Sequence, residues 1–344
     1  MQAIRKAANA WVEPDYGPRA EAAAKTLGAP NTFTEEAVAF AVNQLMDRLR
    51  SDASTSERGD SGGVLRGVVG VVNRGETPLD DLSGLLAVLG AGYRYLGTRA
   101  EASPFLLPAF VEEIRRYDPD FPAAFVADEE ALFERAGAVI ARGDEDERMR
   151  LAALAERCGL PSERLLLLPD RFGVAVLDGR ESEDELEHLA EDVLLHEGRG
   201  AASVALVCAP QGLSPDALLD AFAAFRGVFP AHPSTPGRLK MQQAFLKAAG
   251  QPHAYGEGLE FLMSRGPAEV QQPGHVRWVE YDDRGQVEAW LGEHSGEIEL
   301  VVARPHLAGR LRSPYVPLAP GHAHRQPPGA SPSTEQMRAF LSGL

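Results

Sequence analysis

Residues 64–72 read VLRGVVGVV, and residues 73–96 continue NRGETPLDDLSGLLAVLGAGYRYL. The first stretch is short, apolar and rich in β-branched residues, which is typical of a strand buried on both faces of a sheet. A turn with glycine and proline follows at 73–78, then a helical run over 79–89, and AGYRYLG predicts a second strand. A strand, a helix and a strand in this order predict one unit of a parallel α/β sheet.

The same alternation continues along the rest of the chain. Further strands are predicted over 123–127, 138–141, 165–168, 173–177 and 202–210, and further helices over 104–117, 129–135, 144–158, 181–195, 214–225, 238–249 and 333–341. The late segments VRWVEYDD, GQVEAWLG and EIELVVARP alternate apolar and polar residues, which predicts strands, some of them antiparallel. We therefore predict an α/β fold with a parallel sheet covered on both faces by helices, a nucleotide-type architecture.

A helical arm is predicted before this body. Thr34 caps a helix over 34–49, in which Val38, Val42, Leu45 and Leu49 recur at helical spacing. Residues 51–63, SDASTSERGDSGG, are typical of a flexible connector.

The composition excludes several classes of function. The 50 acidic and 34 basic residues give a net charge of −16, whereas binding to nucleic acid needs a basic surface, so neither nucleic acid nor an electrostatic hold on anionic lipid is expected. The two cysteines exclude a disulfide-rich scaffold and a zinc site built from cysteine. Without a secretory signal or an apolar stretch long enough to span a membrane, we expect a cytoplasmic protein.

Four segments together resemble the long-chain acyl-CoA reductase family of the aldehyde dehydrogenase superfamily. They are residues 66–96, 138–156, 170–210 and 319–344, so the resemblance covers most of 64–344. It implies an aldehyde dehydrogenase-like fold with two Rossmann-type parallel-sheet domains and a helical N-terminal arm. The implied division is an arm and linker at 1–62, a cofactor-binding-type domain at 63–195 with 305–344 packing back on it, and a catalytic-type domain at 196–304.

The implied reaction reduces a fatty acyl thioester to an aldehyde. A cysteine thiolate attacks the thioester and NADPH supplies hydride, a chemistry that requires an activated nucleophile and donors aimed at the oxyanion. The family carries this cysteine in a pattern similar to G-x-G-C-R-S, but here the cysteine slot after Gly200 is occupied by Ala201. Ser203 is the nearest hydroxyl, and we interpret Cys208, in an apolar run, and Cys158 as structural.

A second implied site also departs from the family. The turn that resembles G-N-x-P keeps Gly75 and Pro78 but has Glu76 in the asparagine slot, where a carboxylate would repel an oxyanion. As an alternative, Glu76 is a first-turn residue favoured by a helix dipole.

The slots implied for the cofactor, NADP or NAD, also differ from those of the family. The slot of a lysine that reaches the adenosine ribose falls near Thr98, and Gly143 and Asp144 resemble the turn that opens a helix toward the dinucleotide. The acidic run that starts at Asp144 would repel a pyrophosphate, or it simply caps a surface helix.

We weigh two hypotheses on these grounds. The first is an NAD(P)H-dependent acyl-CoA reductase acting on an acyl-CoA or acyl thioester, which is the less favoured because its cysteine, asparagine and lysine slots are changed. The second is a pseudoenzyme of the same fold that binds an acyl thioester, a nucleotide or a partner. A homodimer or a companion subunit is an expectation from the resemblance alone. His322 and His324 could face one side of a strand, but without further ligands we expect no metal site.

Overall fold

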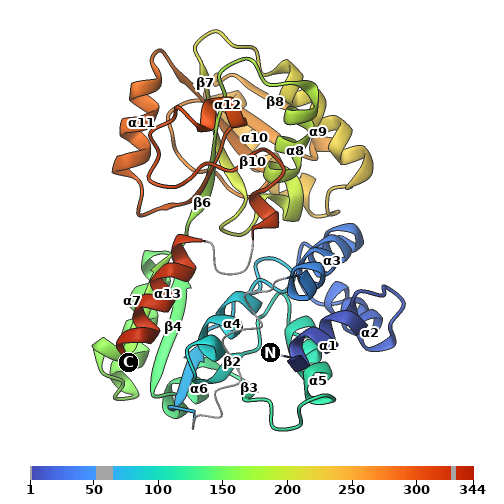
Figure 1. The fold of residues 1–344 in the computed structure, drawn as a ribbon. Coiled ribbons are helices and arrows are strands. Elements are labelled where there is room, and N and C mark those ends of the chain that lie inside the picture. Colours follow the sequence, from blue (N-terminus) through green and yellow to red (C-terminus); the bar gives the residue numbers. More distant parts are fainter. Residues whose placement is uncertain (1, 52–64, 327–330) are drawn as a thin grey trace. The chain divides into compact units, whose positions relative to one another are not determined.

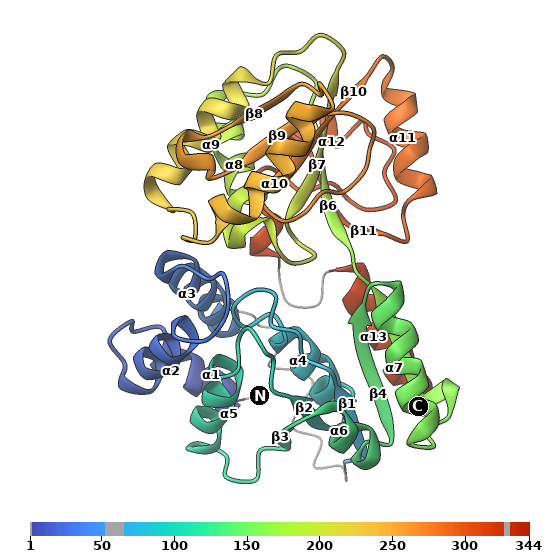
Figure 2. The same ribbon diagram turned by 180° about the vertical axis from the view of Figure 1, so that it is seen from behind.

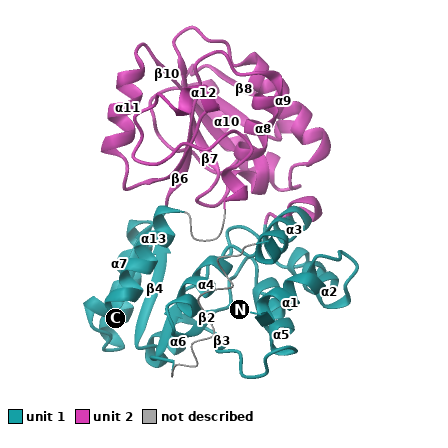
Figure 3. Cartoon of the chain, in the orientation of Figure 1, with its two compact units in different colours: residues 1–31, 38–170, 327–344 teal, residues 32–37, 171–326 magenta. Residues whose placement is uncertain are grey.

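A computed structural model describes residues 2–51, 65–326 and 331–344. Nearly all of the predicted connector at 51–63, and residues 327–330 of the tail, lie outside the described residues. The chain divides into two compact units (Figure 3): unit 1 contains residues 1–31, 38–170 and 327–344, and unit 2 contains residues 32–37 and 171–326.

Unit 1 is built on a five-stranded parallel sheet in the order β3-β2-β1-β4-β5 (Figure 1). Its strands are β1 (Val68–Val71), β2 (Arg94–Thr98), β3 (Ala123–Val126), β4 (Ala138–Gly143) and β5 (Leu165–Pro169). Its helices are α1 (Gln2–Trp11), α2 (Gly17–Leu27), all but the first residues of α3 (Glu35–Ser51), α4 (Leu82–Gly90), α5 (Leu106–Arg115), α6 (Glu129–Arg135), α7 (Glu145–Arg157) and α13 (Pro332–Gly343), with the short 3₁₀ helix η2 (Ser162–Arg164).

Helices cover both faces of this sheet, as the apolar run at β1 predicts. Successive residues of a strand point to opposite faces. A side chain at Gly70 would meet Leu132 of α6, whereas the next residue, Val71, lies against Gly84 of α4. Most of the predicted arm is part of this unit: α1 and α2 pack on α5, and Trp11 packs edge-on against Phe110 at 5.1 Å, whereas residues 32–37 belong to unit 2.

Unit 2 contains a six-stranded sheet in the order β11-β6-β7-β10-β9-β8 (Figure 2). Its strands are β6 (Phe172–Val176), β7 (Val204–Pro210), β8 (His253–Tyr255), β9 (Leu262–Arg265), β10 (His275–Tyr281) and β11 (Ile298–Val302). Its helices are α8 (Glu183–Leu194), α9 (Asp216–Val228), α10 (Thr235–Ala248), α11 (Arg284–Glu293) and α12 (Pro305–Ala308), with the short 3₁₀ helices η3 (Leu195–Gly198), η4 (Glu257–Leu259) and η5 (Ala323–Arg325). The two parallel-sheet units confirm the predicted α/β fold class.

The boundary between the units falls between Asp170 and Arg171, whereas the sequence analysis expected it between 195 and 196. The segment 171–195 belongs to unit 2 because β6 pairs with both β7 and β11. The tail is shared: residues 305–326 lie in unit 2, and 327–344 lie in unit 1.

Two predictions for the late segments were wrong. GQVEAWLG is not a strand but part of α11, where Asp283 accepts the N–H of Gly285 and Val287 and Leu291, four residues apart, are buried. Some of the late strands were expected to be antiparallel, but β10 and β11 are parallel to their neighbours, and within the described residues only the β8–β9 pair is antiparallel. Among the described helices none combines the length and the apolar character needed to cross a membrane.

Candidate functional site

The loop after β1 is held in place by Gly75 and Asn73. Gly75 has φ = 63°, in the left-handed region, and a Cβ there would lie 2.7 Å from the Cβ of Ala100. Asn73 donates its backbone N–H to the hydroxyl of Thr98 at 2.9 Å and its side-chain amide to the Thr98 carbonyl at 2.8 Å. The buried Thr98, proposed from the sequence as a cofactor contact, thus joins the ends of β1 and β2.

Glu76 lies in the same loop and forms an ion pair. Its Oε1 is 3.3 Å from Nη2 of Arg74, and both side chains are about a third exposed, at 27% and 31%. Arg74 also donates to the carbonyl of Arg142 at 3.2 Å, so it links the turn at Glu76 to the end of β4. Pro78 is buried beside them. The structure therefore brings together the turns containing Gly75 and Gly143, which the sequence analysis had treated separately.

At the start of α7, carboxylates occupy the helix N-terminus. Asp144 accepts the backbone N–H of Glu147 at 2.9 Å, as an N-cap does. A Cβ at Gly143 would lie 2.6 Å from Cγ of Glu147, so glycine permits this side chain to fold back. Hydrogen bonds from Arg150 lower the pKa of Glu147. Asp144 thus caps the N-terminus of α7, as the alternative interpretation of the sequence has it.

A pocket of about 50 Å³ lies at the carboxyl ends of β1 and β4. From β1 the chain first adds β2 and β3 on one side of the sheet, and it then adds β4 and β5 on the other side. The pocket between β1 and β4 is therefore at the topological switch point, where α/β sheets bind ligands. Its charged lining consists of Arg74, Arg142, Glu76, Asp80 and Asp81. Pockets that bind whole small-molecule ligands measure roughly 300–1,000 Å³, so this pocket as it stands accepts only a small group.

A dinucleotide pyrophosphate does not fit this set of residues. Phosphates bind where helix N–H groups are free and positive charge is in excess. Here the α7 N-terminus is capped by Asp144, and Glu76 and Asp80 balance Arg74 and Arg142 around the pocket. The residues therefore offer a polyanion neither a free helix N-terminus nor an excess of positive charge.

We expect the Asp81→Asn substitution to remove part of the pH dependence of unit 1. Burial, then the neighbouring Asp80, raises the pKa of Asp81 from 3.8 to about 8, so the folded carboxyl keeps a proton that the unfolded one loses. Stability of the wild type should therefore fall as pH rises from about 5 to about 8, by at most about 1.4 kcal/mol per pH unit. Asparagine can still accept the N–H of Arg74 but does not titrate.

Urea unfolding at several pH values measures this slope. The exposed Asp120→Asn variant serves as a control and should retain the wild-type slope. Identical slopes for Asp81→Asn and the wild type would show that Asp81 titrates alike in the folded and unfolded chain.

In unit 2, the segment between α8 and β7 carries the proposed nucleophile slot. Gly198 and Gly200 have φ = 68° and 83°, and Ala201 follows, half-buried, in the turn. Ser203 is 2% exposed, and its hydroxyl donates to the carbonyl of Arg199. The hydroxyl of Ser203 is thus engaged in closing the turn. The structure brings Gly200, Ala201 and Ser203 into one loop.

Neither thiol lies in this loop. Cys208 is on β7 within the apolar core, and burial raises its pKa to about 12. Cys158 belongs to unit 1, where it packs beside the core at the end of α7. A thiol with a raised pKa is a poor nucleophile at neutral pH, which supports the structural interpretation of Cys208.

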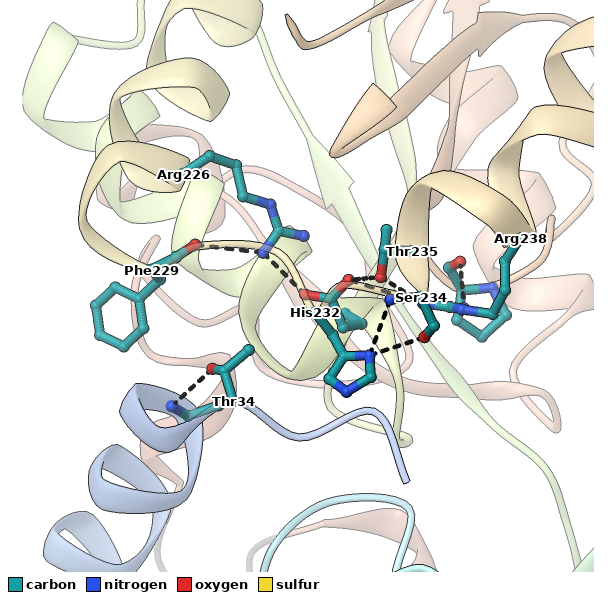
Figure 4. A network of polar contacts seen from close by, with 10 residues as sticks. Thr34, Arg226, Phe229, His232, Ser234, Thr235 and Arg238 are labelled. Carbon is teal, nitrogen blue, oxygen red and sulfur yellow. Dashed lines mark hydrogen bonds and ion pairs between the residues drawn. The ribbon is translucent and has the colours of Figure 1, made fainter. Parts of the chain in front are cut away.

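A buried ionic network anchors the start of the same loop (Figure 4). Glu197 is 2% exposed and has φ = 60°. Its carboxylate accepts a hydrogen bond from Arg226 of α9 at 3.0 Å and another from the Thr235 hydroxyl, and Arg238 of α10 lies 3.7 Å away. Burial lowers the pKa of both arginines. Sequence reasoning missed Glu197, because a single acid in a glycine-rich segment carries no pattern.

The histidine pair of the tail does not lie on a strand, contrary to the prediction. His322 precedes the 3₁₀ helix η5 and is exposed, whereas the ring of His324 packs edge-on against His196 at 5.4 Å. The backbone there is fixed by Asp192, which accepts the N–H groups of Gly321 and Ala323 at 2.7 and 3.0 Å. Among the described residues, no cluster of three or more potential ligands could hold a metal ion.

Comparisons with known structures place this fold. The chain is similar to an oxidoreductase from Marinobacter aquaeolei (13% identity, 93% of this chain and 77% of that one, TM-score 0.68) and to a putative aldehyde dehydrogenase from Burkholderia cenocepacia (13%, 91% and 75%, 0.67). It is also similar to a mutant aldehyde dehydrogenase C from Pseudomonas syringae in complex with NAD⁺ and octanal (12%, 91% and 74%, 0.61). No family model and no curated protein matches the sequence. The fold is thus that of the aldehyde dehydrogenases.

Proposed function

We propose that this chain is an acyl-CoA reductase-like protein that binds an acyl thioester without reducing it through a cysteine intermediate. One observation carries the proposal: in the loop at 198–203, a half-buried alanine, Ala201, occupies the position where the resemblance implies a cysteine. Cys208 lies in the core with its pKa raised to about 12, so it cannot take over that role at neutral pH.

The proposed activity includes no step that depends on a dinucleotide. The residues at the switch point of unit 1 offer a pyrophosphate no excess of positive charge, and Glu76, ion-paired with Arg74, occupies the slot for which the resemblance implies an amide donor. The structurally similar P. syringae protein was solved with NAD⁺ and octanal. For this chain we infer that the acyl group is the retained ligand and that the cofactor function is lost.

Ala201→Cys is expected to restore the first chemical step. The new thiolate would attack the carbonyl carbon of palmitoyl-CoA, the acyl–sulfur bond to CoA would break, and free CoA would leave with a proton. Intact-mass spectrometry should show one palmitoyl group per chain, formed at least about tenfold faster than any background labelling of the wild type, since Cys208 is buried.

Ala202→Cys is the matched control, because Ala202 is the neighbouring residue but packs against the apolar core of unit 2. Acylation of both variants at equal rates would mean that any added thiol reacts, and no acylation of Ala201→Cys would contradict acyl-thioester binding at this loop. Oxidation of NADPH by the wild type in the presence of acyl-CoA would overturn the proposal in favour of an active reductase that uses Ser203 or Cys208.

A further inference from the structure

Helix α10 exposes an apolar stripe on the side that faces away from its own core. Met241 and Phe245 are 80% and 70% exposed, and Ala244 between them is exposed as well. On the opposite side Leu239 and Leu246 are buried, 1% and 3% exposed, where α10 lies over β8 and β9 (Figure 2). A helix of a globular protein ordinarily has one apolar face, so α10 has a second one without a described partner surface.

The spacing of this stripe is that of a helix-packing seam. Gly237, Met241, Ala244 and Ala248 are exposed and separated by four, three and four residues, as the a and d positions of a coiled coil are. Three of these side chains are small, which allows the backbone of another helix to come close. The exposed Phe245 borders the seam on one side.

The other side of the seam is positively charged. Lys240 and Lys247 are exposed and directly precede Met241 and Ala248, at the g positions of the same register. They are two of only four lysines in the chain, and residues 221–256 contain no aspartate or glutamate although the whole chain has a net charge of −16. The face is therefore basic and apolar on an otherwise acidic protein.

We propose that this face of α10 binds an amphipathic helix of a partner protein whose polar edge is acidic. A second copy of α10 is a poor occupant, because an antiparallel pair sets g positions against each other and would oppose lysine to lysine. The acidic helix α8 of a second copy is equally unsuited, because its exposed residues, which include Glu183, Asp184 and Glu187, are polar and cannot fill an apolar seam. An anionic bilayer would meet only two large apolar side chains and the repulsion of the net negative charge.

The test uses a synthetic helical probe. A dye-labelled peptide of about three heptads, with leucine at a and d and glutamate at e and g, is titrated with the full chain and followed by fluorescence anisotropy. We expect saturable binding that weakens as salt rises, because the charged edge is exposed to solvent. The same peptide with lysine at e and g should not bind.

Two variants of α10 decide whether the binding is at this face. Lys240→Glu combined with Lys247→Glu should weaken binding of the glutamate peptide by at least about tenfold and allow the lysine peptide to bind. Phe245→Ser should weaken binding of the glutamate peptide by about tenfold and should not allow the lysine peptide to bind. Lys25→Glu and Met149→Ser change exposed residues of unit 1 and should leave the binding of the glutamate peptide unchanged. All these side chains are at the surface, so the thermal unfolding midpoints should match the wild type.

Four results would overturn the proposal. The first is binding of the glutamate peptide by the α10 variants as strongly as by the wild type, and the second is equal binding of both peptides by the wild type. The third is stronger association with vesicles of phosphatidylserine and phosphatidylcholine than with the peptide. The fourth is self-association that is lost in Phe245→Ser, seen by sedimentation velocity, which would assign the face to a second copy.

Discussion

Glu197→Ala is expected to lower the free energy of unfolding of unit 2 by about 3–5 kcal/mol, because it leaves a buried guanidinium without its counter-ion. Arg226 is 3% exposed at its side chain and Glu197 likewise 3%, so water cannot replace the lost carboxylate. The left-handed backbone at φ = 60° strains glutamate and alanine alike, so the loss measures the missing carboxylate rather than the backbone. Denaturant unfolding followed by the fluorescence of Trp278, which is buried in this unit, measures the loss.

Two comparisons separate the ionic contribution from other effects. Glu21→Ala removes a similarly short ion pair, 2.6 Å to Lys25, but at an exposed site, so it should cost less than about 1 kcal/mol. Combining Glu197→Gln with Arg226→Met removes both charges and should recover much of the stability lost in Glu197→Ala. A loss under about 1 kcal/mol for Glu197→Ala would mean that the network does not hold the loop.

Gly75→Ala should destabilise unit 1 by about 2–5 kcal/mol, from the left-handed backbone together with overpacking. The added methyl group would lie 2.7 Å from Cβ of Ala100 and 3.0 Å from Cβ of Ser103. The loop would have to move, and with it Glu76 and its contact with Arg74. Thermal or urea unfolding of the purified variant measures the effect.

Gly92→Ala is the matched control for this substitution. Gly92 has φ = 83°, but nothing lies within 4 Å of a Cβ placed there, so only the backbone term remains, about 1–2 kcal/mol. Equal losses of unfolding free energy for Gly75→Ala and Gly92→Ala would show that the loop can move away from the added methyl group at no cost in stability.

Most strands of the two sheets were predictable, whereas β8, β9 and one late helix were not. β1, β7 and most of β4 are apolar on both faces, so their sequence carries a strong signal. In α11 the run GQVEAWLG satisfies strand alternation as well as helical spacing, and the choice depends on the Asp283 cap and on burial of Val287 and Leu291 in the fold.

The candidate site was predictable only where a short motif exists. The turns with Gly75, Gly143 and Gly200 were found from glycine and from resemblance, and whether they bind ligand stays a prediction. Asn73 and Glu197 were missed because their partners, Thr98 and Arg226, are 25 and 29 residues away in the chain. Only the folded chain brings such pairs together, although a polar Asn73 directly after a buried run could have drawn attention.

The last helix has a consequence for how the protein is made. α13 packs against α4 and β5, its Leu341 is fully buried, and Met337 lines the pocket at the switch point of unit 1. Residues 171–326, which form nearly all of unit 2, separate α13 from the rest of unit 1 in the sequence. During synthesis the ribosome must therefore make unit 2 before α13 can complete the core of unit 1. Unit 1 is begun first but finishes folding last, and the apolar surface that α13 will cover stays exposed to solvent until then.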